Sequence, residues 1–562
     1  MTQGDVSRHP DTSGLPPNDT RRAVDPPPGQ DLRFSYRSEI DGTDQPYAVY
    51  VPSRYGDGRR WPVVINLHGT SSGRSPELVG QTSEHYYTAD ENAAPLWAAE
   101  RHGVILVTPH GRGITEFRGI GENDVFCVLA EVQRRYSVDP DRISITGVSM
   151  GGTGSTEIAL HHPDMFAAAA PVGAAYSFPW LAANGQHLPF WCIGGEDDFN
   201  FHSGGKLVAE RMERLGYPAR LDIREGREHA DFIPEYYDRI VGWLVRHRVV
   251  RHPRRYSFSA ALPMYGQAYW TAIDAIEQPG TIGTIRAEIA GPNRHTLATE
   301  NLSGIAVLPD AELVDLTGEI QVQVDGQPVF EGAVTPQEEV LLSKVGGRWR
   351  AETAPRRKRS MTAYRTDPVA VASKSLAMEG VDAPLANWIS DAMRAATGAD
   401  VALYNRRHYR GLPIPRGAVD EVDLLQCSRP FEQYLAVADL SGRDLIAVLE
   451  DNIRDPGEGL EYLVQPSGLR YSFSWDRPRG RRITDSDIDA GRSYKVVLEG
   501  QSLERVERHR AMFLAGLRET LDYRVTEVPL RAALYAHAVR TGEIKATAEG
   551  RVHSLEDRTA AG

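Results

Sequence analysis

The first half of the chain is organised around the stretch Ile143-Ser144-Ile145-Thr146-Gly147-Val148-Ser149-Met150-Gly151-Gly152. Its apolar residues alternate as in a β-strand, and it ends in Gly-x-Ser-x-Gly. The next residues, 153–161, have the pattern of a helix. A strand, a tight turn and a helix are the context of a nucleophile elbow, in which Ser149 Oγ stands clear of the backbone. This context favours the elbow over a chance serine in a glycine-rich connection.

A carboxylate that could serve Ser149 follows the predicted strand at 190–193. The residues there are Gly194-Gly195-Glu196-Asp197-Asp198. In chains with such an elbow the acid follows the serine and fixes the tautomer of a histidine. Asp197 is our preferred acid, because Gly-x-x-Asp is the usual turn there. Asp198 and Glu196 compete for the role.

His229 is the candidate general base. It follows the last predicted core strand, at 219–223, and so completes the order Ser, acid, His. His202 and His110 are rivals, but neither comes after that strand. The alternative for His229 is a histidine of a surface loop. We expect His229 to take the proton of Ser149 and to pass it to the leaving group.

An oxyanion hole needs two backbone N–H donors that face the developing charge. The residue after the nucleophile, Met150, is expected to supply one of them. The second is expected from the loop after the first parallel strand, His68-Gly69-Thr70, and we assign it to Thr70. His68 itself is expected to be structural.

The 562-residue chain is long enough for several domains. Its hydrophobic content of 41% and charged content of 25% are ordinary for a soluble globular protein. The formal net charge of −13 argues against a general nucleic-acid or membrane-surface binder. We therefore expect neither nucleic acid nor membrane as a partner.

The cysteines, Cys127, Cys192 and Cys427, are widely spaced and odd in number. They offer neither a disulfide framework nor a metal pattern, and we expect no cofactor and no metal. Residues 1–30 are rich in Pro, Asp, Gly and Thr, which predicts a flexible arm and not a signal peptide. No run is long and apolar enough to cross a membrane. These features predict a cytoplasmic location.

Strand-like and helix-like segments alternate from residue 31 to residue 248. Such alternation predicts an α/β domain with a mostly parallel sheet covered on both faces. The predicted strands are 47–51, 63–67, 104–108, 143–148, 166–171, 190–193 and 219–223. The predicted helices are 93–101, 124–136, 153–161, 205–215 and 234–246.

Four stretches of this region carry a family resemblance. They are Leu67-His68-Gly69, Tyr136-Ser137-Val138-Asp139-Pro140-Asp141-Arg142-Ile143, Gly147-Val148-Ser149-Met150-Gly151-Gly152 and Gly194-Gly195-Glu196-Asp197. Residues 31–248 resemble the esterase branch of the α/β-hydrolase superfamily, close to polyhydroxybutyrate-depolymerase-like and feruloyl-esterase-like proteins. The resemblance implies a serine esterase or acyl hydrolase that forms an acyl-enzyme on Ser149. A small-molecule acyl compound is the implied substrate.

Aromatic residues near the predicted triad are candidates for substrate binding, and we assign that role to Trp180 and Phe199. Trp180 belongs to an insert at 175–189 that could roof the pocket, and Phe199 follows the candidate acids. Further members of this set are Tyr176, Phe178, Phe201 and Phe232. Ordinary core packing is the alternative for all of them.

A basic linker at 248–254 precedes a change of pattern. Short alternating segments between 256 and 353 predict strands, at 284–289, 304–307, 320–324 and 329–330. Asp325-Gly326 between two of them is a hairpin signal. We predict a small β-sandwich, which resembles the accessory β domain that follows the hydrolase domain in some related esterases. Packing or substrate positioning is its expected role.

A second basic linker, at 354–365 with Pro355-Arg356-Arg357-Lys358-Arg359, is expected to be a solvated connector. Beyond it, 385–403 has the pattern of a helix leading into a strand. Five segments resemble the C-terminal domain of bacterial 5′-nucleotidases. They are 385–403, Pro430-Phe431, Leu440-Ser441-Gly442, Ser467-Gly468-Leu469-Arg470-Tyr471 and Gly550-Arg551-Val552. The resemblance extends over 366–555 and implies a mixed α+β domain. In that family the domain binds the nucleoside, partly by stacking aromatic side chains on the base, and Phe431 falls on one such position.

The segment Asn405-Arg406-Arg407-His408-Tyr409-Arg410 departs from the Asn-x-Gly-Gly-x-Arg loop of that family. Asn405 and Arg410 remain, but bulky residues replace both glycines, which disfavours the same close approach of backbone to ligand. The family's metallophosphoesterase motifs are absent from the sequence, so nucleotidase chemistry has no residues to carry it. The domain is expected to recognise a substrate, which could contain a nucleoside and would contact Arg410 and Phe431. Otherwise it is a structural unit, for example in a homo-oligomer.

Two classes of function remain open. The first is a serine hydrolase of ester, thioester or activated acyl bonds, with an acyltransferase as its close variant. The second is a non-enzymatic protein, either a scaffold or a binder of a nucleoside-like ligand, whose triad no longer catalyses a reaction. The intact elbow and the ordered acid and histidine favour the first.

Overall fold

The computed structural model divides the chain into two compact units. One unit comprises residues 1–278 and 282–364, and the other comprises 279–281 and 365–562. Within them the described residues are 29–69, 94–113, 115–175, 177–202, 204–229, 233–357, 359, 367–406, 409, 413–427, 434–456, 460–499, 523–545 and 548–556. All but the last two residues of the predicted N-terminal arm lie outside these ranges.

An eight-stranded sheet is the centre of the first unit, with the order β1-β2-β4-β3-β5-β6-β7-β8. Strands β1 and β2 are antiparallel to their neighbours, and the strands from β4 to β8 pair in parallel. The strands are β1 (Gln30–Arg37), β2 (Asp44–Val51), β3 (Trp61–Leu67), β4 (Ile105–Pro109), β5 (Val138–Val148), β6 (Ala169–Val172), β7 (Phe190–Gly195) and β8 (Ala219–Arg224). The predicted mostly parallel sheet is confirmed.

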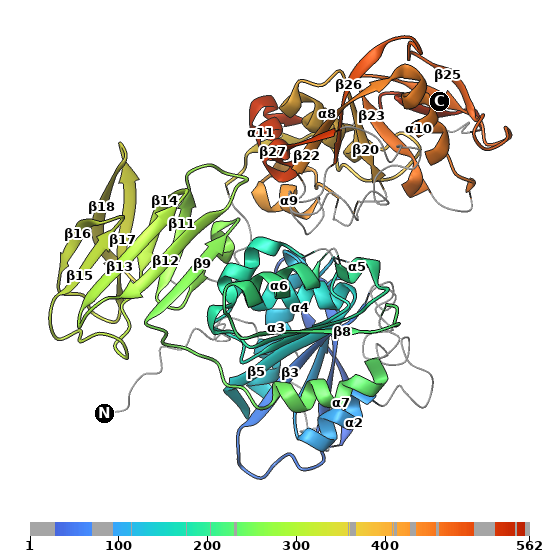
Figure 1. The fold of residues 1–562 in the computed structure, drawn as a ribbon. Coiled ribbons are helices and arrows are strands. Elements are labelled where there is room, and N and C mark those ends of the chain that lie inside the picture. The colour runs from blue at the N-terminus through green and yellow to red at the C-terminus, as the bar shows by residue number, and fades with distance from the viewer. Residues whose placement is uncertain are drawn as a thin grey trace. The chain divides into compact units, whose positions relative to one another are not determined.

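Helices cover both faces of this sheet. Figure 1 shows α3, α4 and α6 on one face and α2 and α7 on the other. The helices are α2 (Ala94–His102), α3 (Ile120–Arg135), α4 (Met150–His161), α5 (Phe199–His202), α6 (Gly205–Arg214) and α7 (Ile233–Leu244), with the 3₁₀ helix η4 (Pro179–His187) between β6 and β7. Every residue of β3 is buried, as expected of a central parallel strand.

The apolar spacing of α7 explains why that helix packs on the sheet. Tyr237, Ile240, Val241 and Leu244 recur every three or four residues, and all four are buried in one core cluster with Trp191 of β7. This spacing is the amphipathic period of a helix that faces a core on one side.

Two five-stranded sheets follow in the same unit, with the orders β10-β11-β14-β17-β18 and β16-β15-β13-β12-β9. The strands are β9 (Arg255–Ala260), β10 (Gln267–Ala268), β11 (Thr271–Ile276), β12 (Gly283–Ile289), β13 (Arg294–Glu300), β14 (Leu302–Val307), β15 (Ile320–Val324), β16 (Gln327–Gly332), β17 (Glu338–Val345) and β18 (Arg348–Pro355), and the 3₁₀ helix η5 (Pro263–Tyr265) follows β9. We call residues 255–355 the β region. The predicted hairpin is present between β15 and β16, because Asp325 and Gly326 have φ angles of 50° and 80°.

The second basic linker is partly exposed where the structure describes it, and two of its arginines pair with acids of the β region. Arg357 and Arg359 both bond to the carboxylate of Glu339, with Arg357 Nε at 2.5 Å and Arg359 Nη1 at 2.6 Å, and both pair with Asp274. Burial alone would raise the pKa of Glu339, but the bonds from these arginines lower it below its usual range. The arginines therefore neutralise a buried acid of the β region.

The second unit contains a five-stranded mixed sheet, β23-β20-β26-β22-β27, and two three-stranded sheets, β21-β19-β28 and β25-β24-β29. Its strands are β19 (Ala370–Ala372), β20 (Val401–Asn405), β21 (Gly417–Val419), β22 (Tyr434–Ser441), β23 (Val464–Ser467), β24 (Tyr471–Phe473), β25 (Ile483–Ser486), β26 (Ser493–Glu499), β27 (Tyr523–Pro529), β28 (Glu543–Ile544) and β29 (Val552–Ser554). Its helices are α8 (Pro384–Thr397), α9 (Glu421–Gln426), α10 (Gly442–Asn452), α11 (Leu530–Thr541) and the 3₁₀ helix η8 (Leu460–Tyr462). The predicted helix and strand over 385–403 are present as α8 and β20.

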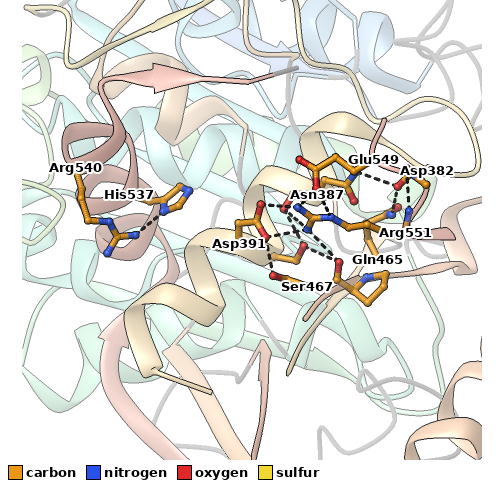
Figure 2. Close-up of polar contacts among 12 residues, drawn as sticks. Asp382, Asn387, Asp391, Gln465, Ser467, His537, Arg540, Glu549 and Arg551 are labelled. Atoms are coloured by element: carbon orange, nitrogen blue, oxygen red, sulfur yellow. Dashed lines mark hydrogen bonds and ion pairs between the residues drawn. The ribbon is translucent and has the colours of Figure 1, made fainter. Parts of the chain in front are cut away.

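A network of polar contacts attaches the end of the chain to α8 and β23 in this unit (Figure 2). The buried guanidinium of Arg551 donates to both carboxylate oxygens of Asp391, at 2.9 and 2.7 Å, and to the carbonyl oxygen of Pro466. Asp382 accepts bonds from the backbone N–H of Arg551 and from the side chain of Gln465. Arg551 therefore joins the chain before β29 to α8 and β23.

Candidate active site

The nucleophile elbow lies between β5 and α4. Ser149 is the residue before the first turn of α4, with φ 58° and ψ −114°, in the positive-φ region that residues other than glycine rarely adopt. Backbone strain of this kind persists where surrounding structure enforces it, and it clusters at functional sites. The Ser149 backbone N–H donates to Val172 O of β6 at 2.9 Å, which fixes the turn to the sheet.

The two glycines of the motif permit this turn. A Cβ on Gly151 would lie 2.0 Å from the carbonyl oxygen of Leu67, and one on Gly147 would lie 2.4 Å from the carbonyl oxygen of Gly151. Both neighbours are backbone atoms, so no side chain could move aside. The end of β3 and the start of α4 therefore touch directly beside Ser149.

Ser149, His229 and Asp198 form one chain of contacts. His229 Nε2 lies 2.8 Å from Ser149 Oγ, and His229 Nδ1 lies 2.6 Å from Asp198 Oδ2. The Asp198 side chain is 1% exposed, whereas that of His229 is 35% exposed. A buried carboxylate thus orients a solvent-accessible imidazole that faces the hydroxyl. This is the geometry of a nucleophile, a general base and an orienting acid.

The structure corrects the choice of acid, because Asp198 and not Asp197 bonds to His229. Asp197 lies on the exposed side of the turn after β7, and its backbone N–H donates to Arg227 O at 3.1 Å. Asp198, one residue further, is buried, and its Oδ1 accepts the backbone N–H of Phe201 at 3.3 Å. Adjacent residues of this turn face opposite ways, so only one carboxylate reaches the imidazole.

The rival histidines have other partners. His202 Nε2 lies 2.7 Å from the carbonyl oxygen of Glu196. His110 packs against His68, which is itself buried with its ring nitrogens 2.9 Å from the carbonyl oxygens of Gly69 and His110. Burial lowers the pKa of His68 below its usual range. These contacts fit a structural His68 at the end of β3.

Met150 is the first residue of α4, so its backbone N–H is one of the donors without a partner inside the helix. The contact of Gly151 with Leu67 and His68 brings the end of β3 close to the start of α4. Thr70, the predicted second donor, lies outside the described residues.

The predicted substrate-binding residues have different outcomes. Trp180 of η4 is buried, and its ring packs against Phe178 and His161 with centroids 5.6 and 6.4 Å apart, which is the core-packing alternative. Phe201 is buried over Gly194 of β7. Phe199 starts α5, beside Asp198, but its side chain is not described. Tyr176, Phe232, Arg410 and Phe431 lie outside the described residues.

One feature beside the elbow has no counterpart in the sequence-based prediction. The loop after β4 packs on the nucleophile helix, since a Cβ on Gly154 would lie 2.8 Å from Phe117, and Phe117 also packs against the ring of His68. Phe117 has a φ of 53° and Glu116 a φ of 56°. Arg118 pairs with buried Glu157 of α4 at 3.4 Å, and burial raises the pKa of Glu157 well above its usual range. The sequence signal available was the glycine-rich run from Gly111 to Gly121.

Within the described ranges, no group of three or more His, Cys, Asp or Glu side chains could hold a metal ion. The three cysteines are free thiols, two of them buried. No helix in the described part of the chain is both long enough and apolar enough to span a bilayer.

Comparison with known proteins supports both sequence resemblances. Residues 127–214 match the Esterase family model, and residues 365–506 match the model of the 5′-nucleotidase C-terminal domain. The chain joins an esterase-like α/β-hydrolase region to a 5′-nucleotidase C-terminal-like domain. At the level of the superfamily, its first part is of the serine-hydrolase type.

Individual relatives match one part or the other. The chain is 28% identical over 136 residues to the trifunctional nucleotide phosphoesterase protein YfkN of Bacillus subtilis, covering 24% of this chain and 9% of that protein. It is 24% identical over 223 residues to the S-formylglutathione hydrolase of Paracoccus denitrificans, covering 34% of this chain and 73% of that protein. A solved 5′-nucleotidase precursor from Thermus thermophilus has 22% identity and a TM-score of 0.30, over 42% of this chain and 54% of that one. The chain thus spans less than two thirds of the nucleotide-processing relatives that it matches.

Proposed function

We propose that the chain is a serine hydrolase that cleaves an ester or related acyl bond of a small molecule through an acyl-enzyme on Ser149. The observation that carries this proposal is the contact chain from Ser149 Oγ through His229 to Asp198 at a strained elbow. The esterase-family match over 127–214 supports it independently.

In this proposal, Ser149 Oγ attacks the acyl carbon while its proton moves to His229 Nε2. Asp198 accepts the Nδ1–H of His229, which holds the tautomer and stabilises the imidazolium. The alkoxide leaves with the proton from Nε2, and the acyl group remains on Oγ. Water then attacks the acyl carbon with His229 as base, which releases the acid and restores Ser149 Oγ–H.

The oxyanion of each tetrahedral intermediate needs two N–H donors. Met150 at the start of α4 would supply one, and the chain after Gly69, at Thr70, would supply the other. The contact between the end of β3 and Gly151 supports this pairing, because Leu67 and His68 shortly precede Thr70 in the chain.

The remaining parts are assigned accessory roles. The two five-stranded sheets would form the β-sandwich expected from the sequence. The mostly antiparallel pairing of their strands, with β13 and β15 paired in parallel, supports this. The 5′-nucleotidase C-terminal-like domain would recognise part of the substrate, with Arg410 and Phe431 as its candidate contacts, and would do no chemistry itself. The match over 365–506 supports that role.

Covalent labelling tests the hydrolase assignment. Intact protein is treated with a small fluorophosphonate, digested, and analysed by mass spectrometry. We expect one phosphonyl adduct, on the peptide that contains Ser149, and no adduct on the Ser149→Ala protein. Equal labelling of both proteins, or none of either, would contradict the proposal.

A further inference from the structure

Three contacts hold the far end of the nucleophile helix to the β region. The first is a stack between rings. Tyr265 of η5 lies parallel to His161, the last residue of α4, with ring centroids 4.0 Å apart and planes at 4°. Both side chains are buried. An aromatic contact this close fixes the position of both rings.

The second contact is a hydrogen bond just after α4. The backbone N–H of Tyr269 donates to Asp164 Oδ2 at 2.8 Å, and Asp164 is buried. A carboxylate that accepts a backbone N–H away from water makes a charge-assisted bond with defined geometry. It ties the turn that leaves the helix to the strand pair β10 and β11.

The third contact is made through Asn184 of η4, which is 1% exposed. Its Nδ2 donates to the carbonyl oxygen of Leu160 in α4 and to that of Ser259 in β9, both at 2.9 Å. Its Oδ1 accepts the backbone N–H of Ser259 at 2.7 Å. One amide group thus joins the last turn of α4 to β9.

Further polar side chains surround His161 where the end of α4 meets the β region. Its Nδ1 lies 3.8 Å from Glu122 of α3, and His162 Nε2 lies 2.8 Å from the same carboxylate. Burial and the charge of Glu122 raise the pKa of Tyr265 well above its usual range, so its hydroxyl keeps its proton. Residues from α3, α4 and η5 therefore meet in one buried polar cluster.

These contacts at the end of α4 bear on the position of Ser149, because α4 begins directly after that residue. All twelve residues of α4 are buried, and the helix carries Ser149 at its start and His161 at its end. At the rise of an α-helix, these two residues lie about 18 Å apart. The start of α4 touches the backbone of β3 at Gly151 without room for a Cβ. A shift of the far end would therefore tilt the helix against β3 and move Ser149 relative to His229.

We infer that the β region fixes the nucleophile helix, and that Tyr265 and Asp164 are positioning residues for Ser149. This inference rests on the proposed hydrolase function. It gives the β region a part in catalysis although none of its residues touches the reacting atoms. The hydrolase region and the β region would then form one catalytic body.

The test uses full-length variants. Tyr265→Leu removes the stack, Tyr265→Phe keeps the ring, and Asp164→Ala removes the bond from Tyr269. Trp349→Leu is the matched control, because Trp349 is a buried aromatic of the β region whose indole N–H donates to Asp325 at 3.0 Å, within that region. The readouts are the rate constant for labelling by a small fluorophosphonate, and kcat and KM for p-nitrophenyl acetate. All are measured at a temperature at which circular dichroism shows every variant folded.

We expect Tyr265→Leu and Asp164→Ala to lower the labelling rate and kcat by about 10- to 100-fold, the effect of a small misplacement of a reacting group, with KM within about twofold. Tyr265→Phe should restore most of the wild-type rate, and Trp349→Leu should keep it even where its melting temperature falls.

Wild-type rates in folded Tyr265→Leu and Asp164→Ala would overturn the inference and leave the hydrolase proposal intact, as would an equal loss in Trp349→Leu. If Tyr265→Leu does not fold, Asp164→Ala decides the matter. A wild-type protein that takes no label would overturn the hydrolase proposal, and the inference with it.

Discussion

Asp198 Oδ2 lies 2.6 Å from Nδ1 of His229, and this contact turns the opposite ring nitrogen toward Ser149 Oγ. The carboxylate is buried while the imidazole is partly exposed. Because the acid is inaccessible to water, its bond to the ring competes with no solvent. The contact therefore defines both the tautomer and the direction of the base.

Asp198→Asn is expected to lower kcat for a p-nitrophenyl ester by about 10⁴-fold, because an amide would favour the wrong tautomer of His229. Asp197→Asn, its matched neighbour on the exposed side of the turn, should stay within a few-fold of wild type. Steady-state kinetics on both purified variants would measure this. A larger loss in Asp197→Asn would return the acid role to Asp197.

Ser149→Ala is expected to abolish turnover of the same ester, with a loss of about 10⁴-fold or more. The substitution removes one oxygen from an intermediate-exposure position, so the melting temperature should change little. Turnover and thermal unfolding are measured on the same preparation. Residual turnover close to wild type would show that another residue is the nucleophile.

The elbow could be predicted from the sequence because its geometry requires glycine at particular positions. Gly147 and Gly151 are glycines since backbone atoms occupy the space of their Cβ atoms. The choice between Asp197 and Asp198 involves no such requirement. It depends on the backbone bond of Asp197 to Arg227, a partner 30 residues away in the chain.

The ion pairs of the second linker could not be predicted for a similar reason. Five residues with four positive charges indicate a solvated segment when only near neighbours are considered. The acids that pair with Arg357 and Arg359 are Asp274 of β11 and Glu339 of β17, which lie much earlier in the chain. The sequence also left the role of Trp180 open, and its buried ring packs on His161, which is the core-packing alternative.

Glu339→Gln should destabilise the first unit at neutral pH, by about 3 kcal/mol, because a buried ionic cluster loses its central acid. The pKa of Glu339 is lowered in the folded state, so the unfolded state binds its proton first as the pH falls. Its stabilisation is therefore complete above the ordinary glutamate pKa of about 4.3 and is lost progressively below it. Urea unfolding is measured at pH 7 and at pH 3.5. The difference in free energy of unfolding between wild type and variant should be smaller at the lower pH.

Glu331→Gln is the control for that experiment, since Glu331 is exposed on β16 and bonds only to Gln321 at 3.0 Å among the contacts described. Glu331→Gln should change the free energy of unfolding by no more than about 0.5 kcal/mol at both pH values. A difference in unfolding free energy between Glu339→Gln and wild type that is constant with pH would mean that folding does not change the pKa of Glu339.

Arg551→Met should destabilise the second unit by about 3 kcal/mol or more, because Asp391 and two buried carbonyl groups lose the bonds that the guanidinium donates to them. Arg540→Met is the matched control in the same unit. Arg540 is exposed and bonds to His537 Nδ1 at 2.6 Å (Figure 2), so its loss should cost no more than about 0.5 kcal/mol. Hydrogen exchange of α8 and β23 measures both. Equal exchange in the two variants would show that the Arg551 network does not hold the chain end.

Deletion of all residues after Arg359 should spare turnover of a small artificial ester, because Ser149, Asp198, His229 and the strands of the β region all lie in the first unit. The deletion should weaken only the reaction with the physiological substrate, if the second unit recognises part of it. The measurement is kcat/KM for p-nitrophenyl acetate, with Ser149→Ala in the shortened chain as the blank. We expect a value within about threefold of full length, and added divalent metal should release no phosphate from AMP with either protein. A folded, shortened chain that loses its small-ester turnover would show that the second unit completes the active site, and recognition could not then be its only role.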